Sequence, residues 1–189
     1  LVGNIGNPVL CEKKITKNTF FVIEASSYQL DYSQLFTSKY SVILNISPDH
    51  IERHRNLKNY ISAKFKLLNS QSRDSIAFVK KNDLLINKKL SSKRYNPKII
   101  KVDLKKANTI IKLIKNKYLL SAGNLENLSF ILKISEKLNL NNKILIKTLN
   151  RFKGLKYRQQ IIYENKNLII INDSKSTSFA SSENLLKNL

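Results

Sequence analysis

Three short runs of apolar and β-branched residues place the strongest constraint on the fold. They are TFFVIEAS (19–26), YSVILNIS (40–47) and SIAFVK (75–80). Strands that are buried on both faces of a parallel sheet have such continuous apolar runs. The segments between them, 29–36 and 56–69, have helical spacing, and Asn56 is the expected N-cap of the longer one. The alternation predicts an α/β fold with a mostly parallel sheet flanked by helices.

The second half of the chain has a different pattern. The elements expected there are a strand hairpin over 109–120, helices over 124–138 and about 141–151, two strands (QQIIYE and NLIIINDS) joined by 165–167, and a last helix from Thr177. We place a domain boundary at Gly154, so the expected domains are residues 1–153 and residues 154–189.

Composition restricts the setting in which the protein works. The single cysteine, Cys11, excludes an internal disulfide framework and favours a reducing compartment. No apolar run approaches the roughly 20 residues that span a bilayer, and no signal-peptide pattern opens the chain. We therefore expect a cytoplasmic protein without a membrane partner. Because the chain contains no methionine and begins with LVGNIGNPVL, which is typical of the middle of a domain, we also expect a fragment of a longer protein.

The net charge of +21 has two interpretations. It is compatible with nucleic-acid binding, or it reflects a lysine-rich, solvated surface. The cations are spread along most of the chain instead of forming one block, which favours the solvated surface.

Acidic and imidazole side chains follow two of the expected strands. Glu24 follows FFVI, and Asp49 and His50 follow VILNISP. In open α/β sheets, ligands gather beyond the carboxyl ends of the strands, so Glu24 and His50 are expected to face one crevice. A carboxylate with an imidazole is a partial ligand shell for a divalent metal. The alternative is that Asp49 forms a turn and His50 is an ordinary surface histidine.

Lys64 lies on the apolar stripe of the helix expected over 56–69. The stripe consists of Leu57, Tyr60, Ile61, Phe65 and Leu68. Burial favours the neutral amine, which reacts with carbon dioxide to give a carbamate, in effect a carboxylate suited to Mg²⁺. The alternative is that the Lys64 side chain extends to solvent.

The segment NDSKST (172–177) follows an apolar strand and precedes an expected helix. Asp173, Lys175 and Thr177 therefore cluster at a strand-to-helix turn, where helix amides attract anions. The chain has no G-x-x-x-x-G-K-[ST] segment, so these 189 residues contain no P-loop.

Six stretches in order, GNIGNP, IEASSYQL, LNISPDHIERH, YISAKFKL, FKGLKYR and INDSKSTS, resemble the Mur ligase family over essentially the whole chain. The resemblance implies the family's central ATP-binding domain without its P-loop strand, followed by the first part of a Rossmann-like C-terminal domain. It also implies an ATP-dependent ligase of peptidoglycan synthesis that works through an acyl phosphate. We expect the chain alone not to turn over, because it lacks the P-loop.

The resemblance also assigns roles to individual residues. The metal ligands are Glu24 and His50, together with Lys64 as a carbamylated lysine, so the cofactors are ATP and Mg²⁺. Asn4 and Ser26 match positions that contact the UDP-sugar substrate, and Asn124, Arg158 and Asp173 match positions around the adenine and ribose of ATP. Lys175 and Thr177 match positions near the phosphates and the incoming amino acid, and Lys64, His50 and Lys175 are the expected catalytic residues.

NDSKST points to the branch of the family that joins D-glutamate to UDP-N-acetylmuramoyl-L-alanine, so these two compounds are the expected substrates of a monomeric full-length enzyme. The sequence departs from the family at Gly123, where a histidine usually precedes Asn124, and at Ser176 and Ser178. Two alternatives stay open. One is another Mur or folylpolyglutamate-type ligase, and the other is a basic nucleic-acid-binding module that only the charge supports.

Overall fold

The apolar run at 75–80 forms the centre of a three-stranded sheet. In the computed structural model, which describes residues 1–103, 109–176, 183, 185 and 186, the sheet has the order β3–β4–β5. Its strands are β3 (Tyr40–Ile43), β4 (Ile76–Lys80) and β5 (Lys98–Val102). Strands β3 and β4 are parallel, with Val42 opposite Phe78, which confirms the predicted parallel pairing. The described residues divide into two compact units, Leu1–Lys101 and Val102–Leu189.

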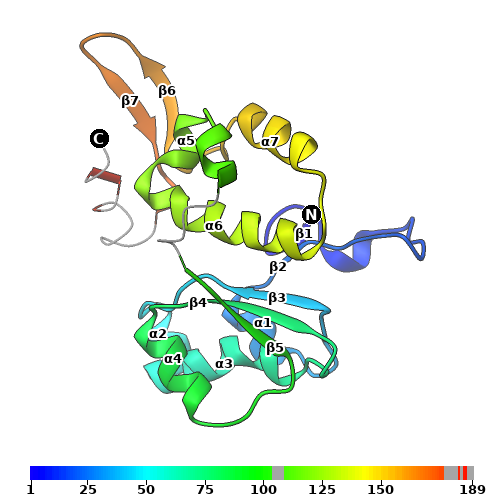
Figure 1. Ribbon diagram of the computed structural model, residues 1–189. Helices are drawn as coiled ribbons and strands as arrows, with labels where there is room; N and C mark the ends of the chain where they lie inside the picture. The colour runs from blue at the N-terminus through cyan, green and yellow to red at the C-terminus, as the bar shows by residue number, and fades with distance from the viewer. Residues whose placement is uncertain (104–108, 177–182, 184, 187–189) are drawn as a thin grey trace. The chain divides into compact units, whose positions relative to one another are not determined.

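Helices α3 (Leu57–Asn69) and α4 (Leu84–Ser91) pack on one face of this sheet (Figure 1). Each begins at a side-chain cap: Asn56 accepts a hydrogen bond from the backbone N–H of Asn59, and Asp83 accepts one from that of Ile86. The core between helices and sheet contains Ile43, Tyr60, Phe65, Leu68, Ala77, Val79 and Ile86. Burial of these apolar side chains is the main stabilising contribution in the first unit.

The prediction that 40–47 is a strand buried on both faces is wrong for one face. Ser41 and Ile43 are buried, whereas Tyr40 and Val42 are each 36% exposed. The reason is that α3 and α4 cover only one face of the sheet, so the side chains of β3 alternate between the core and the other face.

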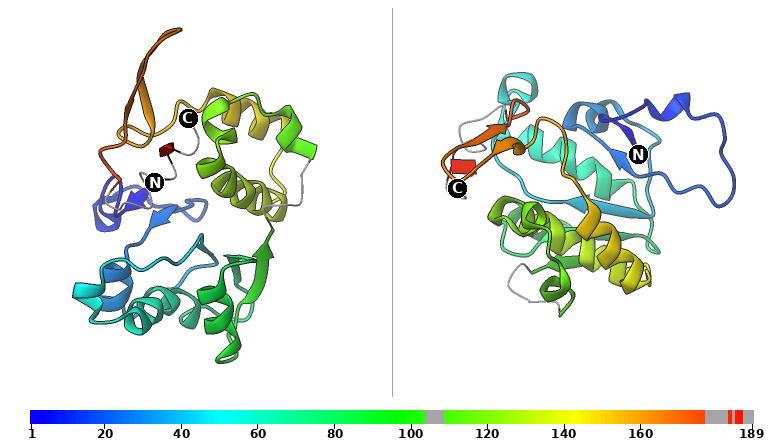
Figure 2. Two further views of the ribbon diagram at one scale, coloured as in Figure 1. Left: turned by 90° about the vertical axis from the view of Figure 1, so that its left-hand side faces the viewer. Right: turned by 90° about the horizontal axis from the view of Figure 1, so that it is seen from above.

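The prediction for 19–26 is also wrong in length and burial. Only Ile23 and Glu24 form a strand, β2, which pairs in parallel with β1 (Val2–Gly3). Phe20 is 84% exposed. Among the described residues β2 has β1 as its neighbour and β1 is two residues long, so there is no surface to cover the preceding side chains. Residues 8–22, which include the 3₁₀ helix Val9–Cys11, form a loop that projects from the sheet (Figure 2).

Two short helices complete the first unit. They are α1 (Ser27–Tyr32), which overlaps the helix predicted over 29–36 but begins two residues earlier, and α2 (Ile51–His54), which follows β3. Both contact α3, so the residues after the carboxyl ends of β2 and β3 lie near the same helix.

The second unit is helical where the sequence predicts a hairpin. Residues 109–120 form a 3₁₀ helix (Thr109–Leu113) and α5 (Lys117–Leu120). The hairpin prediction is wrong because the Asn116 side chain caps α5, and the apolar residues pack as a cluster with two longer helices. These are α6 (Ala122–Lys137) and α7 (Asn142–Arg151), both as predicted. The shared core includes Ile114, Leu119, Leu128, Leu132 and Leu149.

An antiparallel hairpin, β6 (Gln160–Glu164) and β7 (Ile169–Asn172), follows these helices, as predicted, and extends away from them (Figure 2). The helix predicted from Thr177 lies outside the described residues, apart from three positions. The domain boundary expected at Gly154 remains a prediction. Among the described residues, no helix is both long enough and apolar enough to cross a membrane.

Candidate metal and nucleotide sites

Asn4 and Glu24 meet where β1 and β2 end. The Nδ2 atom of Asn4 donates to Oε1 of Glu24 at 3.0 Å, and its backbone N–H donates to the Glu24 carbonyl at 2.8 Å. Gly3 has a φ of +109°, and a Cβ atom there would collide with the backbone oxygen of Glu24. A glycine is therefore required for this close approach, which places an expected substrate-binding residue against an expected metal ligand.

Ser26 begins helix α1. Its hydroxyl accepts a hydrogen bond from the backbone N–H of Gln29 at 3.2 Å, and its own N–H donates to the Gln29 side chain at 2.9 Å. This reciprocal capping box fixes the chain two residues after Glu24. The expected contact between Ser26 and a substrate remains a prediction.

His50 adopts a left-handed backbone conformation, with a φ of 52°, directly before α2. Its N–H donates to Oδ1 of Asp49 at 2.9 Å, and its Nε2 lies 3.5 Å from Oδ2 of the same carboxylate. Asp49 therefore has the local contacts of a turn residue. A non-glycine residue with positive φ is uncommon, and such strain often occurs at functional positions.

Lys64 lies half-buried on α3 beside the fully buried Phe65. Its Nζ atom lies 5.0 Å from the centre of the Tyr60 ring, a cation–π distance. No ion pair joins Lys64 to a carboxylate within the described part of the chain. The predicted apolar stripe is present, and Lys64 lies at its margin with its amine directed over an aromatic ring.

A series of ring contacts connects Lys64 with His50. The Tyr60 ring lies 5.4 Å from the imidazole of His54, which stacks on Tyr28 at 5.5 Å, and Tyr28 lies 5.0 Å from His50. His54 is 6% exposed, and its Nε2 lies 3.0 Å from the hydroxyl of the buried Ser27. Helices α1, α2 and α3 each contribute one of the intervening rings.

Sequence reasoning missed Tyr28, Tyr60 and His54 as parts of this arrangement. The available signal was the spacing of His50 and His54, which lie one helical turn apart. A cavity of about 350 Å³ lies beside His54 and is also lined by Asp31, Arg53, Arg55 and Lys66, among others. Lys66 donates to Asp31 at 2.9 Å and lowers the pKa of that carboxyl below its ordinary value.

The donor set fits Mg²⁺ only in part. No three His, Cys, Asp or Glu side chains in the described ranges form a metal-binding group. Of the expected ligands, Glu24 alone supplies a carboxylate, and Mg²⁺ prefers oxygen ligands. A carbamate on Lys64 would add a second anionic group. The donor types would therefore suit the ion only with a modified Lys64, and the ligand set remains a prediction.

In the second unit, Tyr118 connects two of the expected nucleotide-binding residues. Its carbonyl accepts a hydrogen bond from Nδ2 of Asn124 at 3.0 Å, and its hydroxyl donates to the Arg158 carbonyl at 3.4 Å. Gly154, with a φ of +79°, lies against the Tyr118 ring, where a Cβ atom would approach ring carbons at 3.1 Å. Tyr118 thus contacts the segments of both expected nucleotide-binding residues, a connection that the sequence did not reveal.

Asp173 and Lys175 lie beside the same loop. Oδ1 of Asp173 accepts from the N–H of Gln159 at 3.0 Å, and the N–H of Lys175 donates to the Tyr157 carbonyl at 3.1 Å. The structure therefore brings the segments around Arg158 and Asp173 together. Thr177 lies outside the described residues.

Comparison with known proteins gives consistent matches. A family model described as the Mur ligase middle domain matches residues 3–148. A UDP-N-acetylmuramoylalanine–D-glutamate ligase of Rickettsia prowazekii is 32% identical over 207 residues, covering 100% of this chain and 46% of the relative. Ligases of the same name from Pseudothermotoga lettingae and Buchnera aphidicola are each 34% identical, over 98% and 100% of this chain and 44% and 46% of those proteins. The chain thus spans about half the length of the curated relatives that it matches.

Proposed function

Because this chain belongs to the Mur ligase family, we propose that it is the ATP-binding core of a ligase that joins D-glutamate to UDP-N-acetylmuramoyl-L-alanine. We infer these substrates from the names of the relatives, and the proposed activity is that of the complete protein. ATP would activate the carboxylate of the UDP-linked substrate, and the amine of D-glutamate would then form the new amide bond.

In this proposal Glu24, His50 and a carbamylated Lys64 hold Mg²⁺. The bound ion would reduce the repulsion between the substrate carboxylate and the phosphates of ATP. The Asn4 amide, which donates to Glu24, orients that carboxylate from the substrate side. The observation that supports the proposal most is the series of ring contacts between His50, which precedes α2, and Lys64 on α3, because it ties the segments that carry two expected ligands into one packed cluster.

Formation of the carbamate requires the neutral amine of Lys64. The cation–π contact with the Tyr60 ring stabilises the ammonium by about 0.5–1 kcal/mol, which carbamate formation has to overcome. Among the described residues no carboxylate forms an ion pair with Lys64. The ammonium therefore lacks the stronger stabilisation that such a pair would give. A divalent cation at Glu24 would then favour the carbamate, because the anion gains a direct ligand bond.

In the second unit Asn124, Arg158 and Asp173 would contact the adenine and ribose of ATP. The Nδ2 group of Asn124 is occupied by the Tyr118 carbonyl and the Ser121 hydroxyl, which leaves its Oδ1 as the acceptor for an adenine amine. The Arg158 guanidinium is exposed at a loop that Tyr118 and Asp173 hold in place. Lys175 and Thr177 would lie near the phosphates and the incoming D-glutamate.

The test uses the complete ligase. With ATP, Mg²⁺ and UDP-N-acetylmuramoyl-L-alanine, phosphate release should require D-glutamate and should be absent with L-glutamate or L-lysine. Equal release with another amino acid would replace this assignment by a different ligase of the family. No release with any amine would contradict the ligase function.

A further inference from the structure

A cavity of about 510 Å³ lies in the first unit, away from the expected ligands. It is lined by Arg73, Arg94, Tyr95, Asn96 and Pro97. Arg73 precedes β4 and the other four residues precede β5, so the cavity lies at the amino ends of these strands. His50 follows the carboxyl end of β3, which is parallel to β4, and therefore lies toward the opposite edge of the sheet.

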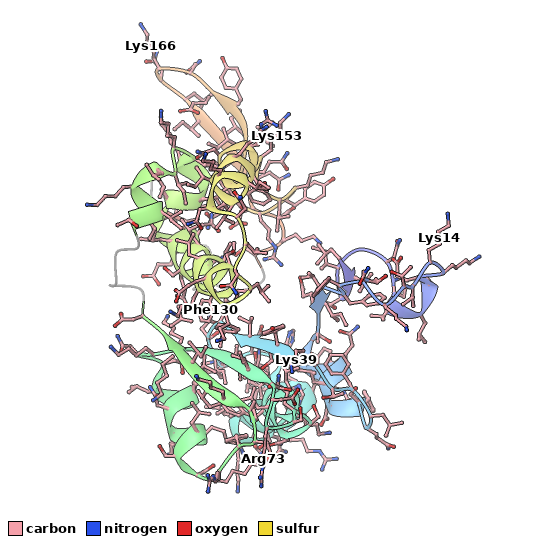
Figure 3. The ribbon with its side chains drawn as sticks, turned by 45° about the vertical axis from the view of Figure 1, so that its right-hand side comes forward. Lys14, Lys39, Arg73, Phe130, Lys153 and Lys166 are labelled. Carbon is pink, nitrogen blue, oxygen red and sulfur yellow. The ribbon has the colours of Figure 1, made fainter. Side chains whose placement is uncertain are left out.

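Backbone hydrogen bonds join the two segments that carry the arginines. The N–H of Lys98 donates to the Ser75 carbonyl at 2.9 Å, and the Ser75 N–H donates to the Ser72 carbonyl at 3.2 Å. Pro97 is buried and fixes the backbone beside Asn96. The cavity is thus formed by two anchored segments, and Arg73 lies at the surface of this unit (Figure 3).

The cavity has cationic groups without a matching anion. No carboxylate is among its lining residues. The nearest acidic residue in sequence, Asp74, is ion-paired with Lys39 and hydrogen-bonded to Ser72. Neither Arg73 nor Arg94 has a hydrogen bond or ion pair with any residue that the structure describes. By contrast, the cavity beside His54 includes Asp31, which already neutralises Lys66.

Two further observations describe the side chains that line this cavity. The chain is rich in lysine and has only six arginines, yet two of them, from distant parts of the sequence, line this one cavity. In addition, the Tyr95 hydroxyl is shielded from solvent and has no hydrogen-bond partner among the described residues. This hydroxyl has no accessible surface and the Tyr95 ring packs on Phe65 of the core, so Tyr95 lines the open cavity through its other atoms.

We propose that Arg73, Arg94, Tyr95 and Asn96 form a binding site for a phosphate group, either free or on a small phosphoester. Arginine binds phosphate oxygens through two parallel charge-assisted hydrogen bonds. Lysine cannot make this paired contact, so in a lysine-rich chain only the arginines provide it. The volume is in the range of small-molecule sites. A polymer would require a continuous basic groove with free aromatic faces, whereas the Tyr95 ring contacts Lys93 and Phe65 of this chain.

The test is NMR of the arginine Nε–Hε groups of the 189-residue chain, which should give six signals. Inorganic phosphate, pyrophosphate and glucose 6-phosphate, added at constant ionic strength without Mg²⁺, should shift the signals of Arg73 and Arg94 in a saturable manner. A lower dissociation constant for glucose 6-phosphate than for inorganic phosphate would identify the ligand as a phosphoester. A lower dissociation constant for inorganic phosphate would identify it as the free anion. Equal shifts of all six signals, or none, would overturn the site.

Variants make the test quantitative. Arg73→Gln and Arg94→Gln should each weaken binding by about tenfold, and Arg94→Lys should weaken it less because it keeps the charge but loses the paired bonds. Arg151→Gln removes the same charge from an exposed helix end and should leave binding unchanged. Lys64→Ala should also leave phosphate binding at this cavity unchanged. The result for the phosphate site is therefore independent of whether the ligase proposal is correct. Tight binding of single-stranded RNA through the same arginines, without phosphate binding, would overturn the assignment in favour of a nucleic acid.

Discussion

The Nζ atom of Lys64 lies 5.0 Å from the centre of the Tyr60 ring. This contact places a half-buried amine on the ring that also touches His54, and His54 is connected to His50 through Tyr28. Lys64 and His50 are thus connected through packed side chains of this chain alone. Variants of Lys64 and of the Tyr60 ring therefore test the proposed role of Lys64.

Replacement of the Lys64 amine should abolish ligase activity. In the complete enzyme, Lys64→Ala should lower kcat by at least about 1,000-fold, because the proposed carbamate ligand is lost. Acetate or another short carboxylate should restore part of the activity. Lys58→Ala, which removes an exposed lysine from the same helix, is the control and should remain active. Full activity of Lys64→Ala would contradict the proposed role.

The carbamate should be detectable in the chain without substrates. With ¹³C-labelled bicarbonate, carbon NMR should show a carbamate signal that disappears in Lys64→Ala. Because the Tyr60 ring favours the ammonium by about 0.5–1 kcal/mol, Tyr60→Leu should raise the carbamate equilibrium about two- to fivefold. Tyr60→Phe keeps the ring and should leave the equilibrium near that of the wild type. A signal that survives in Lys64→Ala would assign the carbamate to another amine.

The buried pair of His54 and Ser27 should show energetic coupling. His54→Phe keeps a ring between Tyr28 and Tyr60 but leaves the Ser27 hydroxyl unpaired, which should lower the free energy of unfolding by about 1–3 kcal/mol. Ser27→Ala should cost about 1 kcal/mol. The double variant should lose about 1 kcal/mol less than the sum, measured by urea denaturation. Strict additivity would mean that the 3.0 Å contact contributes nothing to stability.

Local signals in the sequence predicted much of this fold. Asn56 caps α3 where expected, and the apolar runs at 40–47 and 75–80 form parallel strands. The hairpin prediction at 109–120 failed because β-branched residues there pack in a helical cluster, a tertiary effect that local propensity does not contain. In the same way, Tyr118 and His54 act through contacts between residues far apart in the sequence. The positions of Glu24 and His50 could be predicted because each follows a strand. The rings of Tyr28, His54 and Tyr60 could not, because their contacts form only in the folded chain.

The Lys39–Asp74 ion pair should make stability depend on pH in the acid range. The ammonium of Lys39, followed by the hydroxyl of Ser72, lowers the pKa of Asp74 from 3.8 to about 2. Because the folded state has the lower pKa, the stabilisation is complete above about pH 4 and is lost as the pH falls toward 2. Thermal unfolding between pH 5 and pH 2 should show this loss, and high salt should weaken it because the pair is exposed.

Two variants separate this pair from the other carboxylates. Asp74→Asn and Lys39→Gln should both flatten the decrease in melting temperature between pH 4 and pH 2, since each removes the same interaction. If the profiles of both variants run parallel to that of the wild type, the pair does not stabilise the folded state.

Asn116 should be more important for stability than an ordinary helix cap. Its Oδ1 accepts from the Leu119 N–H at 3.4 Å, and its Nδ2 donates to the carbonyls of Leu149 at 2.9 Å and Phe152 at 2.7 Å. Asn116→Ala removes the cap and also leaves two carbonyls at the end of α7 without this donor. We expect it to lower the free energy of unfolding by about 2–3 kcal/mol.

Asn141→Ala is the matched control, because the Asn141 side chain caps α7 through the N–H groups of Lys143 and Ile144 alone. It should lower the free energy of unfolding by about 1 kcal/mol. Urea denaturation followed by circular dichroism measures both variants in the same chain. Equal losses would show that the bonds from Asn116 to the end of α7 add nothing to its role as a cap. A larger loss for Asn116→Ala would show that this amide helps to fix the start of α5 to the end of α7, alongside the Asn150 side chain, which accepts from the Lys115 N–H and donates to the Leu113 carbonyl.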